Sequence, residues 1–238
     1  MSNYFEYHPS YQKQLKDKEK IFKGEYLKYK KDLNDYLNRF YDAKILEIGC
    51  WIGKFSYFCD KIWVKDYTWI DIDDYFFEYN KKDFPNYNFL KIWFQEYLKE
   101  HKNEFDIIFV SHVFEHLDEK ERMEMITGVY GWLREWWIRI NYMPNWDNFL
   151  RFGMCRYWDL THKSIYTNIS FNQLVKSSNL PFEIENFNIY IWVKNKFRRI
   201  IHLIFRFFTK IYFLGMWESF PEFYTWEFIN LLTKKWKN

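Results

Sequence analysis

From Lys44 onward, short apolar runs alternate with amphipathic stretches. The apolar runs, which we expect to be strands, are residues 45–48, 67–71, 88–92, 106–110 and 138–142. Strands that alternate with helical patterns at this spacing predict βαβ units and a parallel sheet. A helix is expected near 170–178. Two further strands, at 182–190 and 227–234, would close the sheet as a hairpin.

The two ends of the chain carry helical patterns of their own. Residues 10–41 are polar and lysine-rich, with aromatic residues at helical spacing, which predicts one or two amphipathic helices. A long basic and aromatic helix is expected at 194–214, as an insert between the two hairpin strands. We therefore divide the chain into an N-terminal helical segment (1–43), a core that bears the sheet (44–191), and a final part (192–238). The final part holds the insert and the closing strand of the same domain.

Composition excludes several classes of protein. The 238 residues suit one α/β domain with an insertion, and 35 basic against 32 acidic residues give no field strong enough to indicate nucleic acid. Cys50, Cys59 and Cys155 are too scattered for a disulfide framework, and no metal-ligand cluster is evident. The first residues lack the apolar run of a secretory signal, so a reducing cytoplasm is the expected compartment. No apolar run reaches the length of about 18 residues that would span a membrane.

A glycine-rich turn follows the first expected strand. The segment from Lys44 to Phe55 has the order strand, turn, helix, and Gly49 and Gly53 in the turn would let a ligand approach the backbone closely. Asp71 ends the next strand, 22 residues after Gly49, where an acidic side chain can accept hydrogen bonds from ribose hydroxyls. The turn alone is a weak signal. The turn, the acid and the strand context together are a much stronger one.

The fourth expected strand and the residues after it, 105–117, read Phe-Asp-Ile-Ile-Phe-Val-Ser-His-Val-Phe-Glu-His-Leu. This segment resembles the class I S-adenosylmethionine-dependent methyltransferases, in particular their small-molecule and glycan-associated branch (types 11 and 23). The resemblance extends over roughly 44–178. It implies a Rossmann-like fold, with a mainly parallel seven-stranded sheet between two layers of helices. It also implies S-adenosylmethionine (SAM) as cofactor, bound by residues of the 44–191 core.

The resemblance assigns roles to individual residues, although ordinary loop packing is the alternative for each one taken singly. Glu47 and the two turn glycines would face the methionine and ribose of the cofactor, and Asp71 would hold the ribose hydroxyls. Phe94 and Gln95 would flank the adenine, whereas Ser111 and His112 would cap the methionyl end. The cofactor-binding residues expected in this way are Glu47, Gly49, Cys50, Trp51, Gly53, Asp71, Ile72, Phe94, Gln95, Ser111 and His112.

Methyl transfer to oxygen requires an aligned acceptor and often a base, for which a histidine is suited. His162 and His116 are the candidate catalytic residues, with His112 as a third histidine in reach. A hydrogen bond that pins a loop is the alternative role for His162, and a structural or cofactor-side role is the alternative for His116. The stretch around His162 resembles the acceptor loop of glycan and lipid-linked sugar methyltransferases. That resemblance would place Arg156, Tyr157, Asp159 and Thr161 around the acceptor.

Tryptophan stands at several positions where the family has glycine or a turn residue. The chain has 13 Trp and only 7 Gly, and their sum of 20 is about the usual glycine share of such a domain. The positions concerned include Trp51, Trp63, Trp69, Trp136, Trp137 and Trp158. Since tryptophan does not supply the positive φ that tight turns need, we hypothesise that UGA codons for glycine were translated as tryptophan. UGG at these codons would reject the hypothesis. A genuinely Trp-rich protein with a degenerate cofactor site is the alternative.

These patterns predict an O-methyltransferase that acts on a sugar, a glycan or a small polar acceptor in the cytoplasm. A nucleic-acid acceptor is disfavoured, because residues 111–114 lack the Asp/Asn-Pro-Pro-aromatic motif that grips a flipped base.

The alternative from another class is a degenerate, non-catalytic module at the membrane surface. The insert suits an interface helix, with a basic stripe on an apolar background, and would give peripheral contact with the inner membrane face. A helix packed on the domain, with its basic edge solvated, is equally compatible. The stripe consists of Arg199, His202, Arg206 and Lys210.

Overall fold

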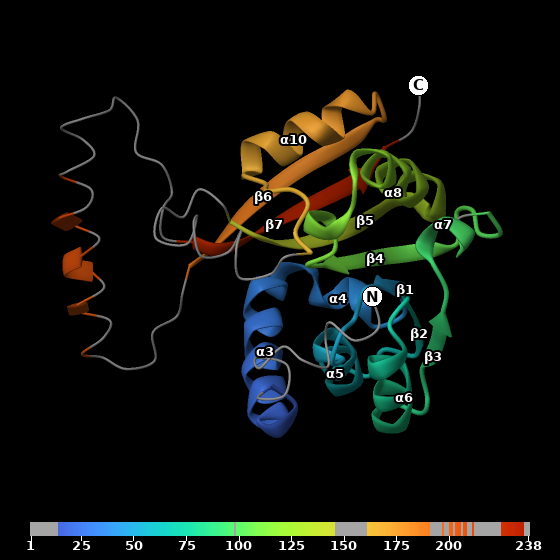
Figure 1. Ribbon diagram of the computed structural model, residues 1–238, viewed down its shortest axis with the longest axis horizontal. Coiled ribbons are helices and arrows are strands. Elements are labelled where there is room, and N and C mark those ends of the chain that lie inside the picture. Colours follow the sequence, from blue (N-terminus) through green and yellow to red (C-terminus); the bar gives the residue numbers. More distant parts are fainter. Residues whose placement is uncertain are drawn as a thin grey trace.

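The computed structural model shows a central sheet covered by helices on both faces (Figure 1). It describes residues 14–97, 99–145, 161–190 and 225–235, and single positions between 197 and 211. The strands are β1 (Lys44–Ile48), β2 (Asp66–Asp71), β3 (Asn88–Lys91), β4 (Phe105–Ser111), β5 (Leu133–Pro144), β6 (Phe182–Tyr190) and β7 (Thr225–Lys234). The predicted Rossmann-like class is confirmed.

The sheet has the order β3-β2-β1-β4-β5-β7-β6. The first five strands are parallel, and β7 is antiparallel to both of its neighbours, β5 and β6. The predicted closing hairpin therefore enters the sheet with its second strand innermost. From β1 the chain adds β2 and then β3 on one side of the sheet. It then returns to the other side of β1 and adds β4 and β5, so the direction reverses between β1 and β4. At such a reversal, ligands bind in the crevice beyond the carboxyl ends of the strands.

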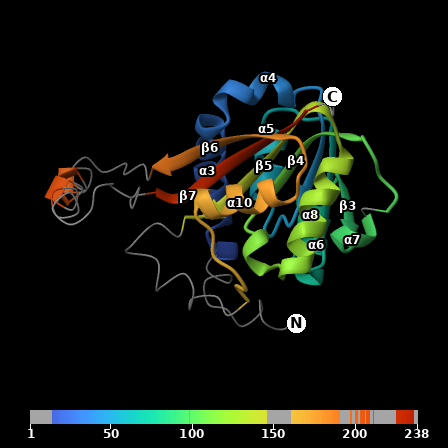
Figure 2. The same ribbon diagram turned by 90° about the horizontal axis from the view of Figure 1, so that it is seen from above.

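Side chains that alternate along the strands pack into two separate apolar cores, one on each face of the sheet. One core joins the sheet to α3 (Lys18–Asp32), α5 (Lys54–Lys61) and α6 (Asp74–Asp83). The other joins it to α7 (Phe94–Tyr97), α8 (Glu119–Trp132) and α10 (Asn168–Ser177). Figures 1 and 2 show these two sets of helices on opposite sides of the sheet. Along β4, for example, Phe109 faces the first core and Ile108 the second, as the two-residue period of a strand requires.

Local sequence signals set where several helices begin. Asp118 and Glu121 form a reciprocal capping box at α8, and Thr167 and Ser170 form another at α10. Before the sheet, a short 3₁₀ turn (Asn34–Tyr36) and α4 (Leu37–Phe40) connect α3 to β1. No helix among the described residues is long and apolar enough to cross a membrane.

The turn expected at Trp136 and Trp137, before the fifth strand, is absent. Both residues lie inside β5, which already begins at Leu133. The pairing with β4 shifts between Leu133 and Ile138, so the irregular residues form a bulge within the strand. The turn was expected from the resemblance alone, and that prediction was wrong because the chain passes these positions as an irregularity inside β5. Trp158 lies outside the described residues.

Candidate active site

The turn after β1 has the backbone that the sequence predicted. Gly49 and Gly53 have φ of 75° and 81°, in the left-handed region that favours glycine. A Cβ atom at Gly49 would lie 2.4 Å from Cγ2 of Val113, and one at Gly53 would lie 2.6 Å from Oδ1 of Asn80. Both positions therefore exclude a side chain. Asn80 also holds the turn, since its Nδ2 donates to the carbonyl oxygen of Trp51 over 2.6 Å.

Asp71 ends β2 beside this turn and connects the two loops. Its Oδ2 accepts a hydrogen bond from the backbone N–H of Cys50 (3.2 Å), and its Oδ1 accepts those of Ile72 (2.6 Å) and Asp73 (3.0 Å). Burial raises the pKa of Asp71 above its ordinary value, although these hydrogen bonds oppose the shift. The next side chain, Ile72, is apolar and yet 53% exposed. An acceptor of ribose hydroxyls next to an open apolar surface suits a nucleoside.

The segment after β3 lies beside Asp71. The backbone N–H of Ile92 donates to the carbonyl oxygen of Asp71 over 3.0 Å, which places the start of α7 next to the end of β2. Phe94 is buried in the second core. Oε1 of Gln95 is buried and has no hydrogen-bond partner among the described residues. The pair expected to flank the adenine is thus on the correct edge of the sheet, and a buried amide oxygen without a partner is suited to a ligand donor.

Trp51 is the residue that fits the cofactor poorly. Its φ of 53° is an outlier for a bulky side chain. The indole lies between the starts of α5 and α6, with Nζ of Lys54 4.6 Å from the ring centroid and the ring of Phe76 at 6.4 Å. Trp63, the second position where glycine was expected, has φ of 61° and is 75% exposed. At both positions the backbone has the conformation that the glycine hypothesis requires.

Trp69 is different. It lies inside β2, is fully buried, and contacts Phe89 and Phe77 in the first core. It is absent from the described residues with positive φ. The backbone at this position therefore gives no reason for glycine, and the argument there depends on the resemblance alone.

Glu47 in β1 is buried beneath the turn. Its Oε2 accepts hydrogen bonds from the hydroxyls of Tyr67 and Ser56. Burial raises the pKa of Glu47 from 4.5 to about 8, because desolvation of the carboxylate outweighs these hydrogen bonds and Asp71 adds a like charge. The carboxyl is therefore largely protonated in the folded chain at neutral pH.

This shift makes stability depend on pH. Between about pH 4.5 and 8 the folded chain retains a proton on Glu47 that the unfolded chain releases. The free energy of unfolding should therefore fall as the pH rises through this window, by a few kcal/mol at about 1.4 kcal/mol per pKa unit. Urea unfolding at about pH 5 and pH 8.5 measures the fall. We expect Glu47→Gln to remove most of it, whereas Glu96→Gln, on the exposed side of α7, should keep it. An unchanged pH dependence in Glu47→Gln would contradict the assignment.

On the other side of the reversal point, His112 follows β4. It has φ of 54°, and its backbone N–H donates to the carbonyl oxygen of Tyr142 over 3.0 Å. Its Nδ1 lies 3.3 Å from Oε1 of Glu115, and its Nε2 lies 3.3 Å from Oε1 of Glu227. Burial alone would lower the pKa of His112, but the two carboxylates outweigh it and raise the pKa to about 9. His112 is thus an imidazolium at neutral pH, suited to hold an anionic group and unsuited to accept a proton.

Two charged residues of this site were missed by the sequence interpretation. Glu227 on β7 forms an ion pair with Lys28 on α3, 199 residues away in the chain. Burial would raise the pKa of Glu227, but Lys28 and His112 together hold it well below the ordinary value. Glu227 reaches His112 only because β7 inserts beside β5. A carboxylate within an otherwise apolar strand was the one signal that could have indicated it.

A third group of polar side chains lies directly after His112. Glu115 and His116 belong to the 3₁₀ turn η2 (Phe114–His116), and His162 comes from the segment after β5. One potential ligand atom from each residue lies within 4.8 Å of those of the other two, and the two imidazole centroids are also 4.8 Å apart. No metal-ligand cluster was evident in the sequence, and the structure brings three potential ligands together. The fold brings together side chains that are about 45 positions apart.

The segment with His162 is fixed by backbone hydrogen bonds. The N–H groups of Lys163 and Ser164 both donate to the carbonyl oxygen of Glu115, over 2.7 and 3.1 Å. The hydroxyl of Thr161 lies 2.8 Å from Nδ1 of His116. The end of the segment that was expected to line the acceptor thus lies against the turn that follows β4. The other residues expected around the acceptor lie outside the described residues: Arg156, Tyr157 and Asp159.

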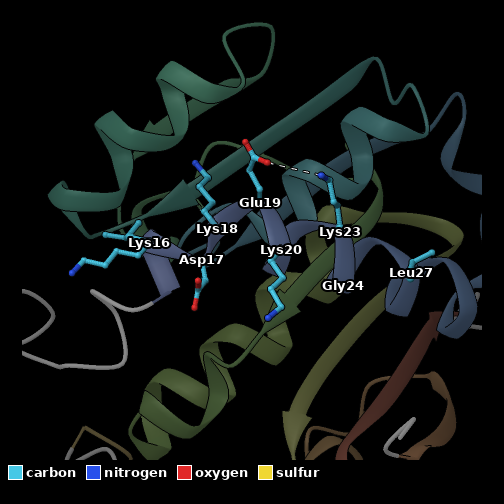
Figure 3. A pocket seen from close by; sticks show the side chains of 9 residues that line it. Lys16, Asp17, Lys18, Glu19, Lys20, Lys23, Gly24 and Leu27 are labelled. Carbon is cyan, nitrogen blue, oxygen red and sulfur yellow. Dashed lines mark ion pairs between the residues drawn. The ribbon is translucent and has the colours of Figure 1, made fainter. Parts of the chain in front are cut away.

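A separate pocket along α3 is not part of this site. Its lining side chains include Lys16, Lys18, Lys20 and Lys23, and Glu19 pairs with Lys23 across it (Figure 3). None of the residues expected to bind the cofactor lines this pocket. Lys16, Lys20 and Lys23 are exposed, as on a hydrated helix surface, whereas Lys18 forms an ion pair with Asp83. We therefore place the cofactor at the carboxyl edge of the sheet.

Comparison with known proteins identifies a methyltransferase domain and a shared fold. A family described as methyltransferase domain matches residues 45–135, which hold the turn, Asp71 and β4. No curated protein sequence matches the chain. Solved structures share its fold. A SAM-dependent methyltransferase from Archaeoglobus fulgidus has a TM-score of 0.68 and 20% identity over 94% of this chain and 100% of that one.

Two more distant structures cover nearly the whole chain. A SAM-dependent methyltransferase from Thermotoga maritima, named as a possible histamine N-methyltransferase, has a TM-score of 0.63 and 13% identity, with 98% of each chain covered. A methyltransferase complexed with the Haloferax volcanii Trm112 activator has a TM-score of 0.62 and 9% identity, over 90% of this chain and 94% of that one. Residues 45–135 thus form a methyltransferase domain, and the fold of the chain is that of the class I SAM-dependent methyltransferases, which implies SAM as the cofactor.

Proposed function

We propose that the chain transfers the methyl group to a hydroxyl oxygen of a sugar, a glycan or another small polar acceptor. The observation that carries this proposal is the pair His116 and His162, which two distant segments bring together beside the end of β4. A hydroxyl is a weak nucleophile until its proton is removed, and an imidazole accepts a proton near neutral pH. His112 is charged by its two carboxylates, so His162 and His116 are the candidate bases.

The residues around the pair support a polar acceptor. Glu115, Glu227 and Lys28 add charged groups to the same edge of the sheet, and Thr161 adds a hydroxyl. Hydroxyl-rich ligands are recognised by such donors and acceptors. Residues 111–114 lack the motif that grips a flipped base, which disfavours nucleic acid. We place the activity in glycan synthesis in the cytoplasm.

Transfer of the labelled methyl group from SAM to a panel of acceptors tests the proposal. The panel contains sugar nucleotides, lipid-linked sugars, histamine and single-stranded RNA. Histamine is included because of the Thermotoga neighbour. We expect product with the sugar nucleotides or the lipid-linked sugars only. Loss of a general base lowers the rate by about 10²–10⁴-fold, so His162→Ala should lower kcat with little change in KM. His101→Ala, which removes an imidazole that pairs with Glu104 away from the site, is the control. Transfer to histamine or RNA alone would contradict the proposal.

A second candidate function is a non-catalytic module at the membrane surface, which two observations favour. Trp51 occupies the cofactor turn, and the described side chains of the insert are apolar and exposed. Those side chains are Phe197, Ile200, Ile201, Leu203, Ile204, Phe205, Phe207, Phe208 and Ile211. The basic stripe of this helix lies outside the described residues. Two results together would favour this candidate. The chain would sediment with anionic vesicles, and it would transfer no methyl group even when it carries Trp51→Gly. Peripheral contact of an active enzyme with a membrane is also compatible with the exposed apolar side chains.

A further inference from the structure

The cluster of Glu115, His116 and His162 has the donor set of a cation site. Glu115 is 1% exposed, and neither of its carboxylate oxygens accepts a hydrogen bond from a described residue. Nδ1 of His112 lies 3.3 Å from one of these oxygens, Oε1, so the other is the oxygen available to a cation. The ion pair with His112 offsets part of the cost of burying this carboxylate, and a cation bound at the other oxygen would offset more of it.

The two imidazoles face this carboxylate in an arrangement that favours binding. Thr161 Oγ1 lies 2.8 Å from Nδ1 of His116. If that nitrogen carries the proton, Nε2 has its lone pair free to bind an ion, as in metal sites where a hydrogen bond orients the ligating histidine. The imidazole of His162 lies 4.8 Å away, at an interplanar angle of 57°. Both histidines are partly exposed, so their side chains can adjust.

We propose that Glu115, His116 and His162 bind one divalent transition-metal ion at the acceptor side of the site. Two imidazoles and one carboxylate favour ions such as Zn²⁺, Co²⁺ or Mn²⁺ over Ca²⁺. Bonds of about 2.0–2.2 Å bring the donor atoms of one ion to about 3–3.5 Å from each other. The atoms here lie within 4.8 Å, so binding needs a modest contraction of the cluster.

Three protein ligands leave coordination positions open, as in catalytic metal sites. Neighbouring hydroxyls of a sugar can occupy two such positions, which orients one of them for methylation and lowers its pKa. This use of the ion rests on the proposed function, whereas ion binding itself does not. In this arrangement both His162 and His116 are ligands, and the lowered pKa of the bound hydroxyl takes the place of the free base in the proposed reaction.

Titration of the metal-free full chain with Co²⁺ tests the proposal without any acceptor. We expect one ion per chain and a visible d–d absorption band. Since loss of an outer partner alone weakens metal binding by about 10–100-fold, loss of a direct ligand should weaken it by about 100-fold or more. His162→Ala and Glu115→Gln should therefore lose the band, and the control His101→Ala should keep it. Circular dichroism reports whether each variant folds. His162→Asn provides a further variant at a partly exposed position in case the buried Glu115→Gln fails to fold.

Two outcomes would overturn the site. Either the folded chain binds no Co²⁺, or His162→Ala and His162→Asn bind it as tightly as the parent chain does. Methyl transfer distinguishes this failure from failure of the proposed function. If the folded chain binds no Co²⁺ and chelator-treated protein still methylates hydroxyl acceptors at the full rate, the metal site is rejected and the O-methyltransferase proposal stands. If Co²⁺ binds at the cluster and no hydroxyl acceptor is methylated, the metal site stands and the proposed function fails.

Discussion

Replacing Trp51 with glycine is expected to raise the affinity for S-adenosylhomocysteine by about tenfold or more, equivalent to about 1.4 kcal/mol. The turn at Gly49–Gly53 must let the cofactor approach the backbone, and we expect a side chain as bulky as Trp51 in this turn to obstruct that approach. Glycine also accommodates the φ of 53°, which costs a bulky residue roughly 1–2 kcal/mol. Titration calorimetry with S-adenosylhomocysteine measures the affinity of both chains.

Trp63→Gly is a matched control for this experiment. Trp63 has nearly the same φ, 61°, but lies in the turn before β2, and its side chain is 75% exposed. Both replacements relieve backbone strain, so both should affect stability, and only the change at Trp51 should affect affinity. If Trp51→Gly binds the ligand no more tightly than Trp63→Gly does, the indole is not the obstruction. The degenerate-module interpretation would then gain support. The codons at these two positions provide an independent test of the glycine hypothesis.

Loss of the Asp71 carboxylate is expected to weaken S-adenosylhomocysteine binding by about 100-fold in the chain that carries Trp51→Gly, or about 2.7 kcal/mol. The carboxylate would accept hydrogen bonds from both ribose hydroxyls, and bonds of this charged kind are worth about 1.5–3 kcal/mol each. Asp71→Ala is compared with Asp66→Ala, which changes an exposed carboxylate at the other end of β2. Asp66→Ala should bind as the parent chain does.

Asp71 also hydrogen-bonds the backbone of Cys50, so the variant could act by loosening the turn. A ligand without the ribose hydroxyls separates the two effects. The dideoxy analogue should bind weakly to the parent chain, and Asp71→Ala should weaken it little further. If Asp71→Ala weakened the analogue as much as the natural ligand, Asp71 would be a structural support of the turn, and the proposed ribose contact would be rejected.

Much of the fold could be predicted because its signals are local. The apolar runs at β1, β2 and β4 are buried on both faces, so each is continuous and easily recognised. The carboxyl half of β5 was predicted correctly. Its start at Leu133 was missed, because the bulge near Trp137 interrupts the apolar pattern. The predicted hairpin requires only that β6 and β7 pair with each other. The position of β7 between β5 and β6 satisfies this requirement.

The sequence by itself determined the cofactor half of the site, because a tight turn and the acid that follows it lie within one βαβ unit. Gly49, Gly53 and Asp71 are 22 residues apart or less, and backbone sterics require glycine at the first two positions. Only the tertiary structure decided the acceptor half. Glu115 and His162, like His112 and Glu227, come from segments that share no local pattern, and strand order and loop crossing bring them together. Long-range packing has no short sequence signal, so these charged contacts could not be predicted from the sequence.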